Sequence, residues 1–288
     1  MLDPVSSLLA SIDLVDTGAR TNEDIFTGPS EWTPQGRLFG GQVLAQSIAA
    51  AIRTVDDERI VHSMHGYFLR PGDIEQPITF AVDRIHDGRS FSTRRTQAYQ
   101  HGQPILSLIA SFQIDDEGLD HQIEMPVLPA PEDLPSSAEV LGGLDHPVAR
   151  HWSTGRPFDM RHAPSPVYLR VDGEHVAHQA VWFKTLSPLP DDPNIHRAAL
   201  AYASDYTILE SILRRHGLPW ATPGLKVASL DHAMWWHRFS RVDEWLLYVQ
   251  ESPSASGGRG LSLGRIYNRD GALVASVAQE GMVRLPRA

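Results

Sequence analysis

The segment Gly260–Gly264 has the pattern G-x-S-x-G, which is typical of a nucleophilic serine on a sharp turn between a strand and a helix. That kind of site also needs an acid and then a histidine later in the chain, but the last histidine is His237. The residues around Ser262 alternate like a hairpin strand and do not lead into a helix. The sequence therefore excludes a serine nucleophile of this type.

Other common reactive groups are missing or badly spaced. The chain has no cysteine, which excludes a cysteine nucleophile, a disulfide, thiolate-held zinc and an iron–sulfur cluster. His62 and His65 form an H-x-x-H pair, but at this spacing along a strand the two side chains face opposite ways. Neither an H-E-x-x-H motif nor a P-loop or dinucleotide fingerprint is present. We therefore expect no bound metal and no separate cofactor.

Composition narrows the class of protein. The 288 residues are 42% hydrophobic and 21% charged, enough for one large domain or two ordinary ones. A net charge of −10 disfavours sequence-independent binding to nucleic acid. No segment approaches the roughly 18 consecutive apolar residues of a membrane-spanning helix, and the acidic start at Asp3 is unlike a secretory signal. These features predict a soluble, cytoplasmic protein that does not bind nucleic acid and is not stably inserted in a membrane.

Hydrophobic periodicity predicts two α+β units with the same order of elements. In the first, a helix opens at Gly40-Gly41 and carries apolar residues at i, i+4, i+7 and i+8 from Leu44. In the second, a helix opens near Ser204-Asp205 and ends before Gly217. The predicted strands are 61–69, 78–82, 92–99 and 105–113 in the first unit, and 227–236, 244–251, 261–267 and 273–279 in the second.

The two units match beyond their order of elements, which indicates a tandem duplication. Between them, 115–165 is rich in proline, glycine and scattered charge, and is predicted to be a surface connector. The expected division is a first repeat at 1–114, this connector, and a second repeat at 166–288. The matched positions fall into three groups, and the sequence offset between the repeats differs only slightly from group to group. The first group is Ser63 with Ser229, and the second is Gly102 with Gly271 and Ser107 with Ser276. The third is Gly88-Arg89 with Gly258-Arg259 and Ser92 with Ser262.

Several longer segments follow one another in a characteristic order. They are RLFGGQ at 37–42, HSMHGYFLRPG at 62–72, DGRSF at 87–91, YASD at 202–205, SLDHAMW at 229–235 and QEG at 279–281. In this order they resemble the acyl-CoA thioesterase II family, which has bacterial and peroxisomal members. The resemblance covers most of 20–284 and is weakest through the connector. It implies an α+β double hot-dog fold, in which two tandem helix-plus-antiparallel-sheet repeats form one continuous sheet layer.

The resemblance also implies an activity, the hydrolysis of acyl-CoA to a free fatty acid and coenzyme A. The catalytic set of the family is an Asp at the start of the second helix, a Thr or Ser in the next strand and a Gln near the C-terminus. These correspond to Asp205, Ser229 and Gln279. Asp205 would be the general base for a water held by the other two, without a covalent intermediate. Coenzyme A is then part of the substrate, no cofactor is implied, and a homodimer or homotetramer is expected.

The residue types themselves leave alternatives open. Ser204-Asp205 also fits a helix N-cap, because both residue types are preferred there. Gly40-Gly41 fits an anion- or oxyanion-binding helix start, and equally a glycine pair needed for tight packing. Arg89 and Arg259 are candidates for binding coenzyme A phosphates, although structural ion pairs explain them as well.

The duplication predicts one active site per chain. At the offset that separates Ser63 from Ser229, the first-repeat position matching Asp205 is Phe39. At the offset that separates Gly102 from Gly271, the position matching Gln279 is Ala110, so the first repeat lacks the catalytic types.

Two other functions share the expected fold. One is an acyl-CoA hydratase-type enzyme, which would need a histidine base such as His65 or His232. The other is an acyl-CoA binding protein without turnover.

Overall fold

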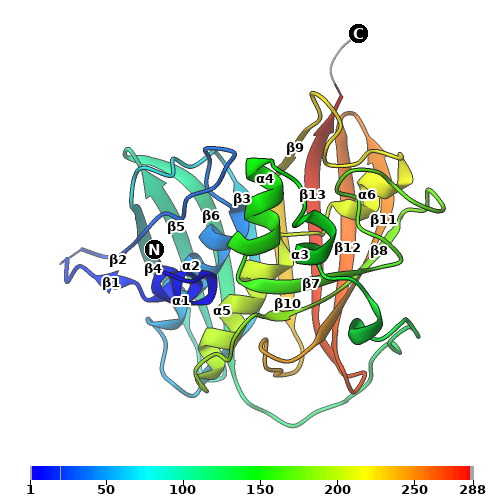
Figure 1. Ribbon diagram of the computed structural model, residues 1–288. Coiled ribbons are helices and arrows are strands. Elements are labelled where there is room, and N and C mark those ends of the chain that lie inside the picture. The colour runs from blue at the N-terminus through cyan, green and yellow to red at the C-terminus, as the bar shows by residue number, and fades with distance from the viewer. Residues whose placement is uncertain (1, 20, 286–288) are drawn as a thin grey trace.

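The computed structural model describes residues 2–19 and 21–285, which form a sheet curved around central helices (Figure 1). The helical elements are α1 (Pro4–Ile12), α2 (Gly40–Ile52), η1 (Pro131–Asp133), α3 (Ser137–Leu141), α4 (Pro147–Arg150), the π-helical turn η2 (His151–Gly155), α5 (Pro193–Ser204) and α6 (Glu210–Arg215). The strands of the first half are β1 (Val15–Asp16), β2 (Asp24–Gly28), β3 (Arg59–Phe68), β4 (Ile78–Asp87), β5 (Phe91–Gln100) and β6 (Gln103–Ile114). The remaining strands are β7 (Phe158–Ala163), β8 (His178–Thr185), β9 (Lys226–Ser229), β10 (Asp231–Trp236), β11 (Leu246–Ser256), β12 (Arg259–Asn268) and β13 (Leu273–Arg284).

The described residues form one antiparallel sheet of 13 strands, and its order is symmetric about one junction. Outward from the β3–β10 pair, the strands run β3-β6-β5-β4-β2 on one side and β10-β13-β12-β11-β8 on the other, while β9 pairs with β13. Met64 lies opposite Met234 at this junction, so an approximate two-fold axis passes between them. Each residue of β3 is therefore equivalent to the residue of β10 that follows it by the same number of positions as Met234 follows Met64. The two predicted tandem repeats and their continuous sheet are confirmed.

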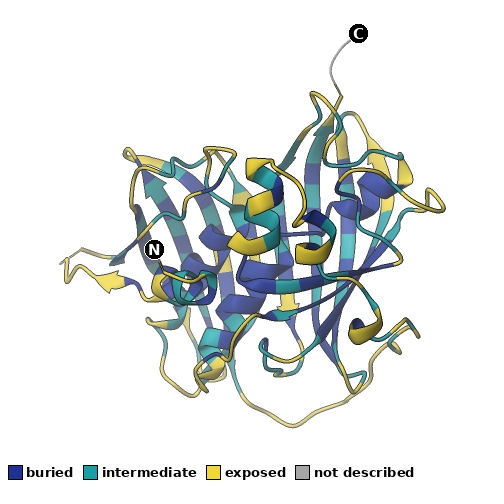
Figure 2. Cartoon of the chain, in the orientation of Figure 1, coloured by how far each residue is buried: buried dark blue, intermediate teal, exposed yellow. Residues whose placement is uncertain are grey.

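The core lies between the sheet and the two helices α2 and α5 (Figures 1 and 2). Leu44 and Ile48 of α2 are fully buried, and α2 is buried on nearly every side because the sheet wraps around it. A Cβ atom added to Gly41 would lie 2.2 Å from the backbone oxygen of Tyr202 in α5. Only glycine therefore lets the start of α2 approach the end of α5 this closely.

The predicted start of the second helix is wrong. Helix α5 begins at Pro193, with Asp192 as its N-cap accepting a hydrogen bond from the Asn194 backbone, and Asp205 lies at its C-terminal end. Helix resumes only at Glu210 as α6. The Asp-Pro pair at 192–193 was the missed signal, since an N-cap acid followed by proline is typical of a helix start. The N-cap explanation of Asp205 is thus excluded.

The segment predicted as a connector contains regular structure. Residues 115–130 run without a helix or strand, but η1, α3, α4 and η2 follow. Strand β7 then pairs with β8 at the edge of the sheet. The three-part division of the chain stays a prediction.

The sheet register also corrects three matches between the repeats. Ser276 lies opposite Trp235, whose counterpart His65 lies opposite Ile109, so the match of Ser107 with Ser276 is wrong.

In the second half, Ser229 on β9 pairs with Gly281 on β13. The equivalent pair in the first half is Arg59 on β3 with Ile114 on β6. Ser63 instead lies opposite Trp235. The match of Ser63 with Ser229 is therefore wrong, because the strands repeat at the slightly longer offset of the two junction methionines.

The match of Ser92 with Ser262 follows that longer offset. Ser92 lies opposite Phe112, and Ser262 lies opposite Gln279. The counterpart of Gln279 is accordingly Phe112 and not Ala110.

Candidate active site

A cavity of about 1190 Å³ lies where the N-terminus of α2 meets the end of α5 and strand β9. Most of its walls are apolar or aromatic, as is usual for a small-molecule site. The lining residues that matter most for chemistry are Glu31, Gly40, Arg156, Tyr202, Asp205 and Ser229. Two distant parts of the sequence thus meet at the cavity, with the glycine from the first repeat and the acid and serine from the second.

The structure brings Asp205, Ser229 and Gln279 together. Ser229 Oγ donates a hydrogen bond of 2.9 Å to Asp205 Oδ1. Gln279 Nε2 donates to Asp205 Oδ1 and to Ser229 Oγ, both at 2.9 Å. Gln279 is fully buried behind the other two residues, whereas Asp205 and Ser229 reach the cavity wall. The three predicted side chains therefore form one closed hydrogen-bonded cluster with a carboxylate on the cavity.

Gly40 and Gly41 lie directly against this carboxylate. A Cβ atom on Gly40 would be 2.6 Å from Asp205 Oδ2, so only glycine leaves room for the acid. The Gly41 backbone N–H and the positive end of the α2 dipole point toward the same carboxylate. The close approach to Asp205 and Tyr202 supports the packing explanation of this glycine pair, and its role in binding a substrate anion stays a prediction.

Opposing influences set the protonation of Asp205. Burial raises its pKa above the ordinary value, and the hydrogen bonds from Gln279, Ser229 and the Gly41 backbone lower it. Burial dominates, so the carboxylate is a stronger base than an exposed aspartate. A buried carboxylate with a raised pKa on a cavity wall is suited to accept a proton.

His232 fixes the orientation of Gln279. Its Nδ1 lies 2.5 Å from Gln279 Oε1, and its Nε2 lies 3.0 Å from Ser204 Oγ. Because Gln279 Nε2 already donates to the acid and the serine, Oε1 accepts, and Nδ1 carries the proton. Burial lowers the pKa of His232, so the ring is neutral and Nε2 can accept from the Ser204 hydroxyl. The contact between His232 and Gln279 depends on the register of β10 against β13. From sequence alone, His232 was therefore a candidate only as a base.

The other predicted side chains lie elsewhere. Arg89 is exposed in the β4–β5 hairpin, and Arg259 forms an ion pair of 3.1 Å with Glu280. The ring of His65 packs edge-on against Trp235 on β10. None of Arg89, Arg259 and His65 lines the cavity. Three exposed arginines line the cavity instead, Arg37, Arg70 and Arg150, and sequence reasoning did not single them out.

Two structural absences concern the described part of the chain, 2–19 and 21–285. There, no cluster of three or more His, Asp or Glu side chains is arranged to hold a metal ion. None of the helices in these ranges has the length and apolar character needed to cross a membrane.

A double hot-dog fold with an Asp–Ser–Gln cluster on a largely apolar cavity defines the class of this protein as a hot-dog protein with a polar cluster at its pocket. The family described as acyl-CoA thioesterase matches residues 153–282, and that described as acyl-CoA thioesterase N-terminal domain matches 28–113. The chain is 39% identical to acyl-CoA thioesterase 2 of Haemophilus influenzae over 267 residues, which cover 90% of this chain and 92% of that protein. The chain belongs to the acyl-CoA thioesterase family.

Solved structures agree with this assignment. The acyl-CoA thioesterase II TesB2 of Mycobacterium marinum is 43% identical, with a TM-score of 0.78 and 98% of both chains covered. A hot-dog fold protein of unknown function from Alicyclobacillus acidocaldarius also has a TM-score of 0.78, covering 98% of this chain and 99% of that one. At 20% identity, this second likeness shows the fold alone.

Proposed function

We propose that the protein hydrolyses acyl-CoA thioesters to a free carboxylic acid and coenzyme A, using a water molecule activated by Asp205. The observation that carries this proposal is the shared hydrogen bonding at one carboxylate oxygen. Ser229 and Gln279 both donate to Asp205 Oδ1, and no side chain among the described residues donates to Oδ2. Oδ2 is therefore available to take a proton from a water at the cavity wall.

The reaction would proceed through a tetrahedral intermediate. The water oxygen attacks the thioester carbonyl carbon while its proton passes to Asp205. Negative charge on the former carbonyl oxygen is stabilised by the first turn of α2, where the Gly40 N–H has no partner among the described residues. The carbon–sulfur bond then breaks, and the proton on Asp205 passes to the thiolate. Water is consumed, and a carboxylic acid and a free thiol are released.

His232 would act in this scheme as a positioning residue. With Oε1 held by His232, the Gln279 amide cannot rotate without losing its bonds to Asp205 and Ser229. This prearranged geometry needs no reorganisation during the reaction.

The finer features of the function rest on the family resemblance and on the cavity. The apolar cavity walls support fatty acyl groups as substrates, with coenzyme A as part of the substrate and no cofactor. A place in fatty acid and lipid metabolism, a cytoplasmic location and a homodimer or homotetramer are included in the proposal. Arg89 and Arg259 remain predicted coenzyme A contacts that neither line the cavity nor approach Asp205 in the structure.

The alternatives have weaker structural support. A hydratase would need a histidine base, but His65 lies outside the cavity and both ring nitrogens of His232 are hydrogen-bonded, which leaves only His151 on the cavity wall among the described residues. A binding protein without turnover would not need the complete Asp–Ser–Gln cluster. The hydrolase is therefore the function that the geometry supports best.

The decisive experiment measures thiol release from a series of short- to long-chain acyl-CoAs by the wild type and by Asp205→Asn. We expect kcat to fall about 100-fold or more, because the amide cannot accept the proton of water. Asp83→Asn is the control, since Asp83 forms a half-exposed ion pair with Arg95 in the first repeat. An inert wild type would overturn the hydrolase, and a fully active Asp205→Asn would remove its proposed base.

A further inference from the structure

Among residues 2–19 and 21–285, three arginine side chains are buried, and two of them have a full set of partners. The guanidinium of Arg94 donates to Thr54, to the backbone of His86 and to Asp87. The guanidinium of Arg214 donates to Gln179, Asp172 and Ser165. Such saturated hydrogen bonding is the normal requirement for burying a charged group.

Arg156 is the exception. Its side chain lies between two aromatic rings, 4.7 Å from the centre of Trp152 and 4.4 Å from that of Tyr206, and the residue is only 9% exposed. Nη1 contacts Met160 Sδ at 3.9 Å, and the phenol of Tyr168 is its remaining polar neighbour. Within 2–19 and 21–285, Nε has no hydrogen-bond acceptor, and no carboxylate forms an ion pair with the guanidinium. Stacking on two rings compensates only part of the lost hydration.

This unpaired cation lines the same cavity as Asp205. Tyr206 follows Asp205 in the chain, and the guanidinium covers one face of its ring while Phe39 stacks on the other at 4.4 Å. Phe39 precedes Gly40, which touches Asp205. Arg156 is therefore connected through the stacked rings of Tyr206 and Phe39 to Gly40, which lies beside Asp205.

The other titratable groups on the cavity wall do not neutralise Arg156. Burial raises the pKa of Glu31, whose Oε2 accepts a hydrogen bond of 2.5 Å from Tyr202, and Glu31 forms no ion pair with the arginine. Burial, together with the charge of Arg156, lowers the pKa of His151 to about 4. The ring of His151 is therefore neutral at pH 7 and adds no second positive charge.

We propose that Arg156 binds a carboxylate carried by the acyl group, and so determines whether acyl-CoAs with an anionic acyl end are accepted. The phosphates of coenzyme A are separated from the thioester by the whole pantetheine arm, so they lie far from Tyr206 when the thioester is at Asp205. A second carboxylate a few carbons from the thioester is the anionic group that an acyl-CoA would place on the same cavity wall as Asp205. A carboxylate matches the planar donor pair of a guanidinium. This inference rests on the proposed hydrolase function.

The test compares adipoyl-CoA with hexanoyl-CoA, which share a six-carbon chain and differ in the terminal carboxylate. For the wild type we expect adipoyl-CoA to be hydrolysed with a kcat/KM similar to or above that of hexanoyl-CoA. In Arg156→Met the ratio of the two kcat/KM values should fall at least tenfold, because the cation is lost while an apolar side chain of similar length remains. Arg197→Met is the matched control, since Arg197 also stacks on an aromatic ring, Phe239, but lies outside the cavity.

Each result decides between the hypotheses. If the wild type hydrolyses hexanoyl-CoA and rejects adipoyl-CoA, the carboxylate subsite is wrong while the hydrolase function stands; if it hydrolyses neither, nor any longer acyl-CoA, the function itself fails. An equal rise of KM for both substrates in Arg156→Met would assign the guanidinium to coenzyme A and overturn the proposal. An unchanged ratio would make Arg156 purely structural. If circular dichroism shows that Arg156→Met does not fold, two measurements still test the proposal. They are the ratio of the kcat/KM values for adipoyl-CoA and hexanoyl-CoA in the wild type and the same ratio in Arg156→Lys, which keeps the charge.

Discussion

The two halves of the sheet carry different side chains at positions that the register makes equivalent. Gln279 faces Ser262 in the second half, and Phe112 faces Ser92 in the first. The amide that binds Asp205 is thus replaced in the first half by a fully buried phenyl ring. The same backbone therefore supports a polar site in one half and an apolar core in the other, which agrees with the prediction of one active site per chain.

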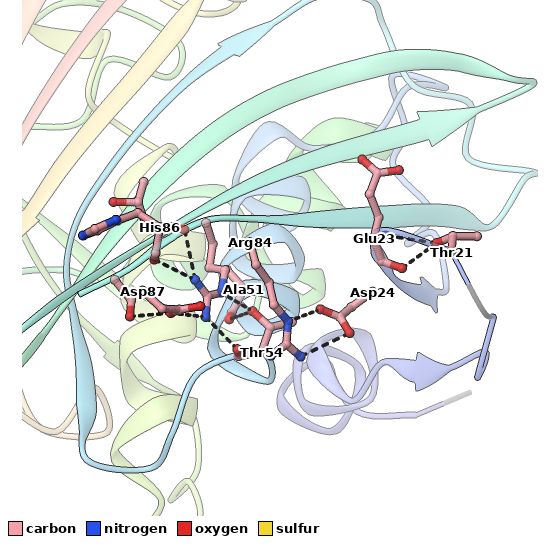
Figure 3. A network of polar contacts seen from close by, with 11 residues as sticks. Thr21, Glu23, Asp24, Ala51, Thr54, Arg84, His86 and Asp87 are labelled. Carbon is pink, nitrogen blue, oxygen red and sulfur yellow. Dashed lines mark hydrogen bonds and ion pairs between the residues drawn. The ribbon is translucent and has the colours of Figure 1, made fainter. Parts of the chain in front are cut away.

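Buried charge is also handled differently in the two halves. In the first half, Arg94 Nη2 donates to Asp87 Oδ1 at 2.7 Å and its other donors reach Thr54 and His86, all three of which are shown in Figure 3. In the second half, burial raises the pKa of Asp205 despite its hydrogen bonds. The hydrogen bonds of Arg94 stabilise its buried charge. Burial of Asp205 makes its carboxylate more basic, which favours proton transfer but lowers stability.

The largest effect that tests this comparison is expected from Gln279→Met. Methionine keeps the approximate volume but loses both hydrogen bonds from Nε2, so kcat should fall about 10²- to 10³-fold. The matched variant Phe112→Met changes the equivalent position of the first half, and it should lower stability by about 1 kcal/mol while leaving kcat within twofold. Steady-state hydrolysis and thermal unfolding measure both. A Gln279→Met enzyme with near wild-type kcat would remove the amide from the mechanism.

A smaller effect is expected at His232, whose counterpart in β3 across the two-fold axis is His62. His232→Leu removes the donor that holds Gln279 Oε1, and one lost hydrogen bond of about 1.4 kcal/mol corresponds to a tenfold fall in kcat with little change in KM. His232→Asn places an amide donor near the position of Nδ1 and should restore most of the activity.

The control for His232 is His62→Leu, because His62 binds Ser111 in the first half and does not line the cavity. Its kcat should match the wild type. If His232→Asn were as slow as His232→Leu, the ring would have a role other than orienting the amide.

The stability contributions of the two acids, buried Asp205 and half-exposed Asp87, should respond to pH with opposite signs. Asp205 has a raised pKa in the folded state, so it binds more protons folded than unfolded, and stability falls as pH rises from the ordinary aspartate range through its folded pKa. Asp205→Asn should therefore unfold at a higher temperature than the wild type at pH 8, and the gap should close toward pH 4. Thermal unfolding at a series of pH values measures this gap. A destabilised Asn variant at pH 8 would contradict the sign.

At Asp87, partial burial tends to raise the pKa, but the hydrogen bonds from Ser92 and Arg94 outweigh it and the pKa is lowered. Its contribution to stability is present above the ordinary aspartate pKa and is lost as pH falls through the lowered value. Asp87→Asn should cost about 1 kcal/mol at neutral pH, since the carboxylate is half exposed, and leave kcat unchanged. Equal stability at pH 8 would show that the pair with Arg94 contributes nothing.

The sequence predicted the parts of this molecule that depend on local patterns and missed those that depend on register. Alternation along the strands and the match of Ser92 with Ser262 are local signals, and they led to the repeated antiparallel sheet. The position of Asp205 at a helix end, the contact of His232 with Gln279 and the unpaired state of Arg156 arise from packing between segments far apart in sequence. The catalytic set came from the family resemblance, because an aspartate, a serine and a glutamine taken singly carry no distinguishing pattern.

The smallest effects are expected at Arg89 and Arg259, the matched arginines of the two repeats. In each, Arg→Gln should change KM for acyl-CoA less than twofold, because neither side chain lines the cavity and Arg259 already pairs with Glu280 at an exposed site. Arg37→Gln, at the cavity rim, is the comparison and should raise KM more than either, most strongly at low salt where attraction to phosphate is least screened. If Arg259→Gln raised KM several-fold with the same dependence on salt, coenzyme A would extend toward the start of β12, and the cavity rim would not be its binding surface.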